Sequence, residues 1–160
     1  MGLLLRTVAV ALLLPVAAQA AVPQRRLTPA EIADLPAQGG GPGTSGMAGV
    51  TTTALAGDPT QPGAYSVRLY VPAHTAIQAH SHRDDRAAVV VSGLWRFGYG
   101  TVAARAALKA LPPGSFYTEP AGQPHFARTG DQAVTVIISG FGPTDTAYVD
   151  ANNDPNRSHP

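Results

Sequence analysis

The sequence of 160 residues contains no cysteine. This absence excludes a disulfide framework, a thiolate nucleophile, thiolate metal ligands and a lipid-modified cysteine. The chain therefore has to be stabilised by an ordinary hydrophobic core. Its length and its 44% hydrophobic residues are sufficient for one globular domain.

Charged residues are also scarce, at 13% of the chain, and neither sign dominates. Outside the first twenty residues, which hold only Arg6, ten Lys and Arg face ten Asp and Glu. No basic stripe follows the sequence, so nucleic acid is excluded as the expected partner.

The chain lacks an apolar run of the roughly 20 residues that a membrane-spanning helix needs. Residues 1–20 instead combine Arg6, a short apolar stretch from Val8 to Leu14, and Ala18-Gln19-Ala20 before Ala21. This order is typical of a cleaved secretory signal peptide, and the alternative is a membrane anchor. We expect a periplasmic or secreted mature protein without a membrane anchor.

Residues 21–62 are rich in Pro, Gly, Ala and Thr and are interpreted as an N-terminal extension and linker. Within them, Thr28-Pro29-Ala30-Glu31 has the pattern of a capped helix start, which predicts a short helix to about Leu35. The glycine-rich run from Gly39 to Gly46 is expected to be an irregular, mobile connector.

From residue 63 onward the pattern predicts an all-β domain that ends near residue 150. Tyr65, Val67, Leu69 and Val71 alternate with polar neighbours, as in a strand with one buried face. Further strand-like runs follow at intervals of roughly 8–12 residues, the spacing of a sandwich or a barrel. They include 87–91 and 94–99, which predict a hairpin, and 116–117, 125–129, 133–139 and 146–149.

Two segments are less regular. Residues 102–111 are alanine-rich and could form a helical turn or two, which Pro112-Pro113-Gly114 would end, and local propensity does not settle this segment. Residues 151–160 are polar and are expected to form a disordered tail.

His80 and His82 lie at the end of a strand-like segment, two residues apart. Side chains at this spacing point to the same side of a strand, so both imidazoles could bind one metal ion. A third histidine, His125, follows Pro120-Ala121-Gly122-Gln123-Pro124, a rigid turn that fixes where the next strand begins.

These two clusters together resemble the two sequence motifs of the cupin family. His80, His82, position 86 and Gly93 match the spacing of the first motif, and Gly114, Pro120, Gly122 and His125 match the second. The resemblance covers about Gly57 to Val149 and is similar to small single-domain cupins of the RmlC-like superfamily. It implies a double-stranded β-helix, a jelly-roll-like barrel, and commonly a homodimer.

The resemblance also implies one divalent transition metal, Fe, Zn, Mn, Ni or Cu, on His80, His82 and His125. The largest departure is Arg86, which stands where the family usually has a glutamate ligand, and an arginine cannot bind a metal. Arg86 either turns away, onto Asp84 or Asp85, or faces the pocket to clamp an anionic small molecule. A metal-free barrel is the alternative, and Asp84 is a further candidate ligand.

Tyr117 and Glu119 lie just before Pro120 of the second motif and are the other candidates for catalysis, besides Arg86. Tyr117 is expected to line the pocket, unless it only fills the core like the other aromatic residues. Glu119 is either a general base near the metal or an ordinary surface carboxylate.

Two functions fit this pattern. The first is a metal-dependent enzyme acting on a small molecule, such as an oxygenase of an enolic or aromatic substrate. The second is a non-catalytic module that binds or senses a metal or a small molecule. Family membership implies a fold and leaves the reaction open.

Overall fold

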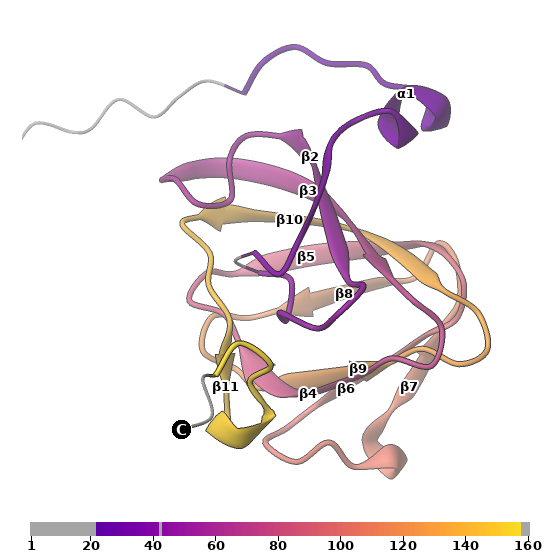
Figure 1. Ribbon diagram of the computed structural model, residues 1–160, viewed down its shortest axis with the longest axis vertical. Coiled ribbons are helices and arrows are strands. Elements are labelled where there is room, and N and C mark those ends of the chain that lie inside the picture. Colours follow the sequence, from indigo (N-terminus) through magenta and orange to yellow (C-terminus); the bar gives the residue numbers. More distant parts are fainter. Residues whose placement is uncertain (1–21, 42, 158–160) are drawn as a thin grey trace, which may run out of the picture.

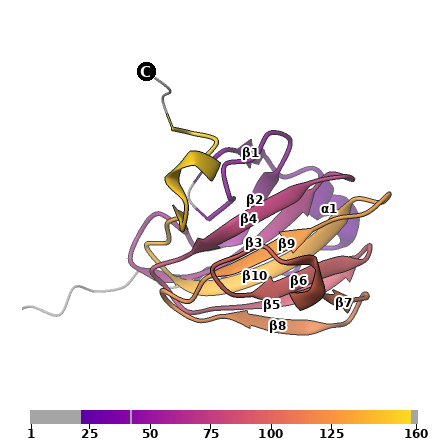
Figure 2. The same ribbon diagram turned by 90° about the horizontal axis from the view of Figure 1, so that it is seen from below.

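The protein is described by a computed structural model over residues 22–41 and 43–157. The interpreted signal peptide, residues 1–20, lies outside the described residues. Two antiparallel sheets stack face to face, as the views along and across them show (Figures 1 and 2). The all-β prediction with one short N-terminal helix is confirmed.

The larger sheet has six strands in the order β1-β2-β3-β10-β5-β8. Their bounds are β1 Ala37–Gly39, β2 Thr51–Ala56, β3 Gly63–Val71, β10 Val134–Gly142, β5 Arg86–Ser92 and β8 Phe116–Glu119. The smaller sheet has the order β11-β4-β9-β6-β7. Its bounds are β11 Ala147–Tyr148, β4 Ala76–Ser81, β9 His125–Arg128, β6 Trp95–Tyr99 and β7 Lys109–Leu111.

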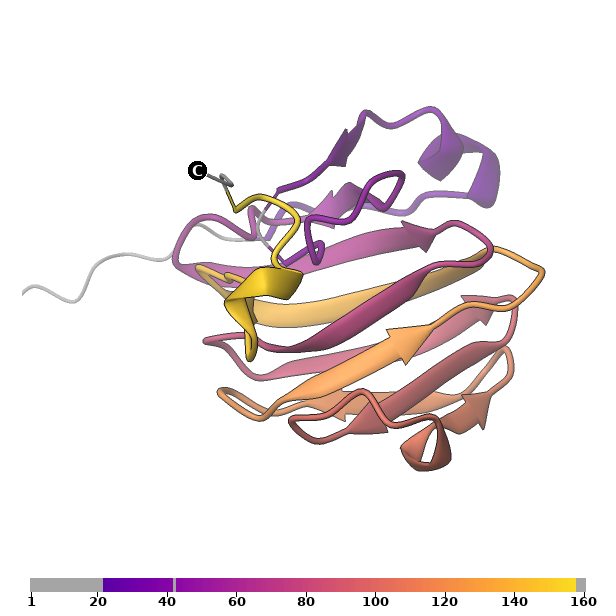
Figure 3. The ribbon, with the colours of Figure 1, turned by 60° about the horizontal axis from the view of Figure 1, so that its bottom comes forward.

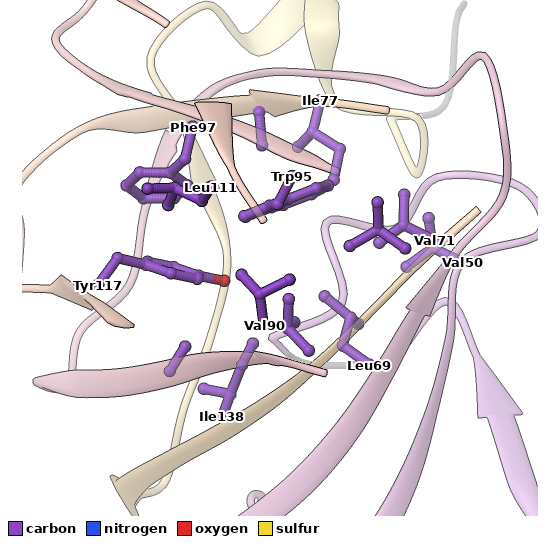
Figure 4. Close-up of a cluster of buried hydrophobic side chains, with 14 of the residues drawn as sticks. Val50, Leu69, Val71, Ile77, Val90, Trp95, Phe97, Leu111, Tyr117 and Ile138 are labelled. Carbon is purple, nitrogen blue, oxygen red and sulfur yellow. The ribbon is translucent and has the colours of Figure 1, made fainter. Parts of the chain in front are cut away.

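The core lies between the two sheets and follows from the alternation in the sequence. In β3, Tyr65, Val67, Leu69 and Val71 are all buried, as predicted. Figure 4 shows Leu69, Val90 and Ile138 of the larger sheet facing Ile77, Trp95 and Phe97 of the smaller one. Burying such side chains stabilises each by about 1.5–3 kcal/mol, which is what holds the layers together.

The helix α1, Pro29–Ala33, begins where the sequence predicts. The Thr28 hydroxyl accepts a hydrogen bond from the Glu31 backbone N–H, and the Glu31 carboxylate accepts one from the Thr28 backbone N–H. This reciprocal cap satisfies the first free N–H groups of the helix. No residue of α1 is buried, so the helix contributes little to the core.

The predicted hairpin between residues 87–91 and 94–99 is wrong. β5 pairs with β10 and β8, whereas β6 belongs to the other sheet and pairs with β7 and β9. Gly93 turns the chain between the layers with φ of 76°, and a Cβ atom there would lie 2.3 Å from the Ala133 carbonyl oxygen. A turn signal between two alternating runs therefore marks a crossing between sheets here.

The six-stranded sheet begins earlier in the chain than the sequence predicts. β2 pairs antiparallel with β3, and β1 pairs with β2, so part of the expected linker 21–62 is sheet. Only Thr53 of β2 is buried. Because this strand contains threonine and alanine and lacks large alternating apolar residues, its sequence carries a weak strand signal.

The alanine-rich segment 102–111 contains a 3-10 turn at Arg105–Ala107, followed by the short strand β7. The expected disordered tail also differs, since Ala151–Asn153 forms a second 3-10 turn. Figure 3 shows this C-terminal segment, in yellow, beside the N-terminal segment. Among residues 22–41 and 43–157, no helix is both long enough and apolar enough to cross a membrane.

Candidate metal site

The three histidines singled out by the sequence lie together inside the sandwich. His80 belongs to β4, His82 follows that strand directly, and His125 begins β9. The antiparallel register places His80 opposite His125, and a shift of register between Ile77 and His80 turns His80 inward. Their exposed fractions are only 4%, 2% and 2%, in chain order. One possible ligand atom from each lies within 4.8 Å of those of the other two.

Each imidazole is oriented by a backbone carbonyl. The Nδ1 atoms of His80, His82 and His125 lie 2.7, 2.5 and 3.3 Å from the carbonyl oxygens of Gln78, Asp145 and Gln123. A carbonyl only accepts, so the proton of each neutral ring belongs on Nδ1 and the lone pair on Nε2. The Nε2 atoms of His82 and His125 are buried and have no hydrogen-bond partner.

Burial keeps these rings uncharged at neutral pH. Burial, together with His125, lowers the pKa of His80 to about 4. Burial and the nearby Arg86 lower the pKa of His125 to about 4, and the same two causes lower the pKa of His82 as well. A metal ion binds the neutral ring, so the site is in the binding form at pH 7 without having to release protons.

The carboxylate that Arg86 contacts is Glu119, rather than Asp84 or Asp85. Arg86 lies opposite Glu119 in the β5–β8 register, and its Nε donates to Glu119 Oε2 at 2.5 Å. A second guanidinium nitrogen, Nη2, also contacts that oxygen, and Nη1 donates to the Gly43 carbonyl at 3.4 Å. Burial opposes the charge of Arg86, but Glu119 outweighs this effect and the pKa of Arg86 is raised.

Glu119 is buried and lies against the histidine cluster. Its Oε2 is 3.8 Å from His82 Nε2, and its Oε1 is 3.8 Å from His125 Nε2. Both separations are too long for a hydrogen bond. The interpretation of Glu119 as an ordinary surface carboxylate is therefore wrong, and it stands near the expected metal position.

Asp84 is not part of the histidine cluster. One of its carboxylate oxygens accepts from the Tyr65 hydroxyl at 2.7 Å and the other from the Thr144 hydroxyl at 2.6 Å. With both oxygens already bonded, Asp84 positions neighbouring strands and loops. Its candidacy as a metal ligand is not supported.

Tyr117 lies on β8 with its ring 4.3 Å from that of Phe97 and its hydroxyl directed into the space between the sheets (Figure 4). It lines a small internal cavity of about 20 Å³ together with His80, His125, Arg86 and Glu119. Such a volume holds one water molecule or a single ion.

The cavity is closed on one side by Gly43, Thr44 and Ser45, which we name the covering segment. Thr44 and Ser45 are buried, and the Tyr148 hydroxyl donates to the Ser45 carbonyl at 2.5 Å. The glycine-rich sequence predicts a mobile connector over these residues. Their packing against the site depends on contacts with Arg86 and with the distant C-terminal strand, which local sequence does not reveal.

No protein-family model matches the chain, and no curated protein is a significant relative. Solved structures do match. The polyketide cyclase RemF from Streptomyces resistomycificus has a TM-score of 0.62 at 18% identity, over 82% of this chain and 89% of that one. A sugar phosphate isomerase from a cupin superfamily, from Silicibacter pomeroyi, has a TM-score of 0.53 at 18% identity, over 69% and 73%.

This chain has the cupin fold. The DMSP lyase DddQ from Ruegeria pomeroyi shares it, with a TM-score of 0.50 and 21% identity over 58% of this chain. The match covers 47% of that lyase, so this chain spans about half of its length. At such identities the likeness establishes the cupin fold alone, and the function has to be argued from the site.

Proposed function

We propose that this cupin is a metal-dependent enzyme that acts on a small molecule and holds one divalent transition ion on His80, His82 and His125. The convergence of three buried imidazoles, each with Nδ1 against a carbonyl, carries this proposal. Buried polar atoms are rarely left without a partner. A metal ion would satisfy the unpartnered Nε2 atoms of His82 and His125.

The donor set fits the ions that the sequence pattern implies. Neutral imidazoles suit Zn, Fe, Mn, Ni and Cu, at metal–nitrogen distances of about 2.0–2.2 Å. A bound ion of this kind would supply Lewis-acid or redox chemistry at an open coordination position. The second nitrogen of each ring, held by a carbonyl, fixes the orientation of the ligand in advance.

The surroundings of the histidines define what the protein itself contributes. Apolar and aromatic side chains, among them Trp95, Phe97 and Tyr117, line the cavity and exclude bulk water. A dry site strengthens electrostatic interactions with a bound ligand. This environment favours an apolar or aromatic small molecule, such as an enolic or aromatic substrate of an oxygenase.

Non-catalytic binding or sensing of a metal is the second candidate, and one observation favours it. The cavity beside the histidines, about 20 Å³, has room for an ion or a water molecule but not for a substrate.

Oxygen consumption separates the two candidates. Protein reconstituted anaerobically with Fe(II) is mixed with a panel of enols and catechols, and the His125→Ala variant serves as the control. The enzyme proposal predicts substrate-dependent oxygen uptake by the wild type and none by the variant. Ligand binding without turnover under every metal tested would favour the sensing function instead.

We also propose that the protein is exported, on the basis of its first twenty residues. Ala18-Gln19-Ala20 fits the small-residue rule for cleavage, so the mature chain is expected to begin at Ala21. Mass spectrometry of the protein purified from its native host tests this. An intact chain starting at Met1 would contradict export.

A further inference from the structure

We propose that Glu119 is a fourth metal ligand and that Arg86 is the residue that positions it. This inference rests on the proposed metal site. It replaces the earlier interpretation of Glu119 as a general base, and it accounts for the arginine at the position where the family resemblance predicts a carboxylate.

The geometry of the carboxylate carries the inference. The two oxygens of Glu119 lie 3.8 Å from the Nε2 atoms of two different histidines, His82 and His125. Neighbouring ligands of a tetrahedral ion at about 2.1 Å are separated by about 3.4 Å. The two Glu119 separations exceed this value by about 0.4 Å, and the two nitrogen atoms have no other partner. Glu119 does not share the 4.8 Å cluster of the three histidines, so its carboxylate would have to move toward the ion on binding.

The distances also exclude direct hydrogen bonds between Glu119 and the histidines. If Glu119 existed to accept hydrogen bonds from the histidines, the separations would be about 2.7–3.0 Å. The Nδ1 atoms already face carbonyls, so the Nε2 atoms of the neutral rings carry no proton to donate. Two lone pairs and a carboxylate that face one another repel, unless a cation lies between them.

Charge balance points the same way. Three neutral imidazoles leave the full charge of a dication uncompensated, and the guanidinium of Arg86 adds a further positive charge to the same closed space. Buried charges are stable only when they are paired. Glu119 is the carboxylate that lines this cavity, and it contacts both the cation already present and the expected metal position.

Arg86 is suited to hold Glu119 in place. The β5–β8 register sets the two residues side by side, and two guanidinium nitrogens contact Oε2. The other oxygen, Oε1, lies on the side of His125. The site then consists of three nitrogen ligands from one sheet and its following loop, and one oxygen ligand from the other sheet.

Titration of chelator-treated protein with Co²⁺ tests this inference, with binding followed by the visible absorption of the ion. Removing the carboxylate alone would leave Arg86 buried without a partner, so the comparison is made in an Arg86→Gln background. Arg86→Gln and Arg86→Gln/Glu119→Gln both lack the guanidinium and differ only in the carboxylate. Glu31→Gln, which removes the other glutamate of the chain, at α1, is the control.

We expect one Co²⁺ per chain in the wild type, Glu31→Gln and Arg86→Gln. The double variant should bind at least about tenfold more weakly, since even groups outside the ligand shell typically contribute 10–100-fold. Its absorption spectrum should also change, because an oxygen ligand is lost.

Equal affinity and an identical spectrum in Arg86→Gln and the double variant would overturn the role of Glu119 and leave the three-histidine site intact. A wild type that binds no Co²⁺, when titrated in the same way, would overturn both proposals. The two failures are therefore distinguishable. In the first, the protein binds one Co²⁺ whether or not Glu119 is present, and in the second it binds none.

Discussion

Asp84 and Glu119 are both buried carboxylates near the histidine cluster, but their partners differ. Asp84 accepts hydrogen bonds from two hydroxyl groups, whereas Glu119 faces Arg86 and two imidazole nitrogens. The hydrogen-bond and ion-pair partners of each residue therefore distinguish Asp84, a structural carboxylate, from Glu119, the candidate ligand.

The Asp84→Asn substitution should destabilise the fold without removing the metal. An amide has one acceptor oxygen, so either Tyr65 or Thr144 would face an N–H group in place of an oxygen. We expect a loss of about 1–3 kcal/mol in the free energy of unfolding, measured with urea. Asp131→Asn is the control, because Asp131 is 98% exposed and should change stability very little. Unchanged stability of Asp84→Asn would contradict this role.

The metal-free protein should lose stability as the pH falls below neutral. Burial lowers the pKa of His80 and His125 to about 4, whereas histidines in the unfolded chain titrate near 6.5. Below pH 6.5 the unfolded state therefore binds more protons, and stability is lost progressively toward pH 4. Each histidine contributes a slope of up to about 1.4 kcal/mol per pH unit.

Urea unfolding of chelator-treated protein at pH 7 and pH 5 measures this effect. His80→Ala should show a weaker pH dependence than the wild type. His74→Asn should keep the wild-type dependence, because His74 is a largely exposed turn residue. Equal stability of the metal-free wild type at the two pH values would show that these histidines are not buried in the neutral form.

The sequence predicted the histidine cluster and named Glu119 as a candidate near the metal, but it did not predict the pairing of Glu119 with Arg86. The spacing of His80 and His82 and the turn before His125, together with the resemblance to the two cupin motifs, indicated that the three imidazoles lie together. The pairing of Arg86 with Glu119 depends on the register between β5 and β8, and the two residues are 33 positions apart in the chain.

At the scale of elements, the covering segment is the part whose role was least visible in the sequence. Its glycines indicate an irregular backbone, which the structure confirms, but they do not indicate that Thr44 and Ser45 are buried against the site. The strands after Ala64 were predictable because large apolar residues alternate, whereas β2 was missed because threonine and alanine do not show this pattern.

The Tyr148→Phe substitution should loosen the covering segment. It removes the hydrogen bond from the Tyr148 hydroxyl to the Ser45 carbonyl, which ties the segment to β11. We expect a chelator to extract the bound metal several-fold faster, at an unchanged metal content of the starting protein. The measurement is the rate of zinc transfer to a colorimetric chelator in excess.

Tyr99→Phe is the matched control for this experiment. The Tyr99 hydroxyl also donates to a backbone carbonyl, that of Thr118, but Tyr99 is not part of the cavity lining. Its variant should release metal at the wild-type rate. Equal rates for all three proteins would show that the covering segment does not limit access to the site.

At the scale of the whole molecule, the proposed metal joins the two sheets. The histidines belong to the five-stranded sheet and to the loop that follows β4, and Glu119 belongs to the six-stranded one. An ion bound only in the folded state stabilises it by about 2.7 kcal/mol when free metal is a hundredfold above its dissociation constant.

Chelation should therefore lower the melting temperature of the wild type by about 5–11 °C for a chain of this size. The His80→Ala variant should melt at the same temperature with and without the chelator. Differential scanning calorimetry provides the measurement. A wild-type melting temperature that is indifferent to the chelator would contradict a metal that couples the two sheets.

The central claim is that His80, His82 and His125 bind one ion, and calorimetric titration of chelator-treated protein with Zn²⁺ tests it most directly. We expect one site per chain in the wild type and in His74→Asn, and loss of tight binding in each single alanine variant of the three histidines. A titration that shows no binding to the wild type, or tight binding that survives all three substitutions, would contradict it.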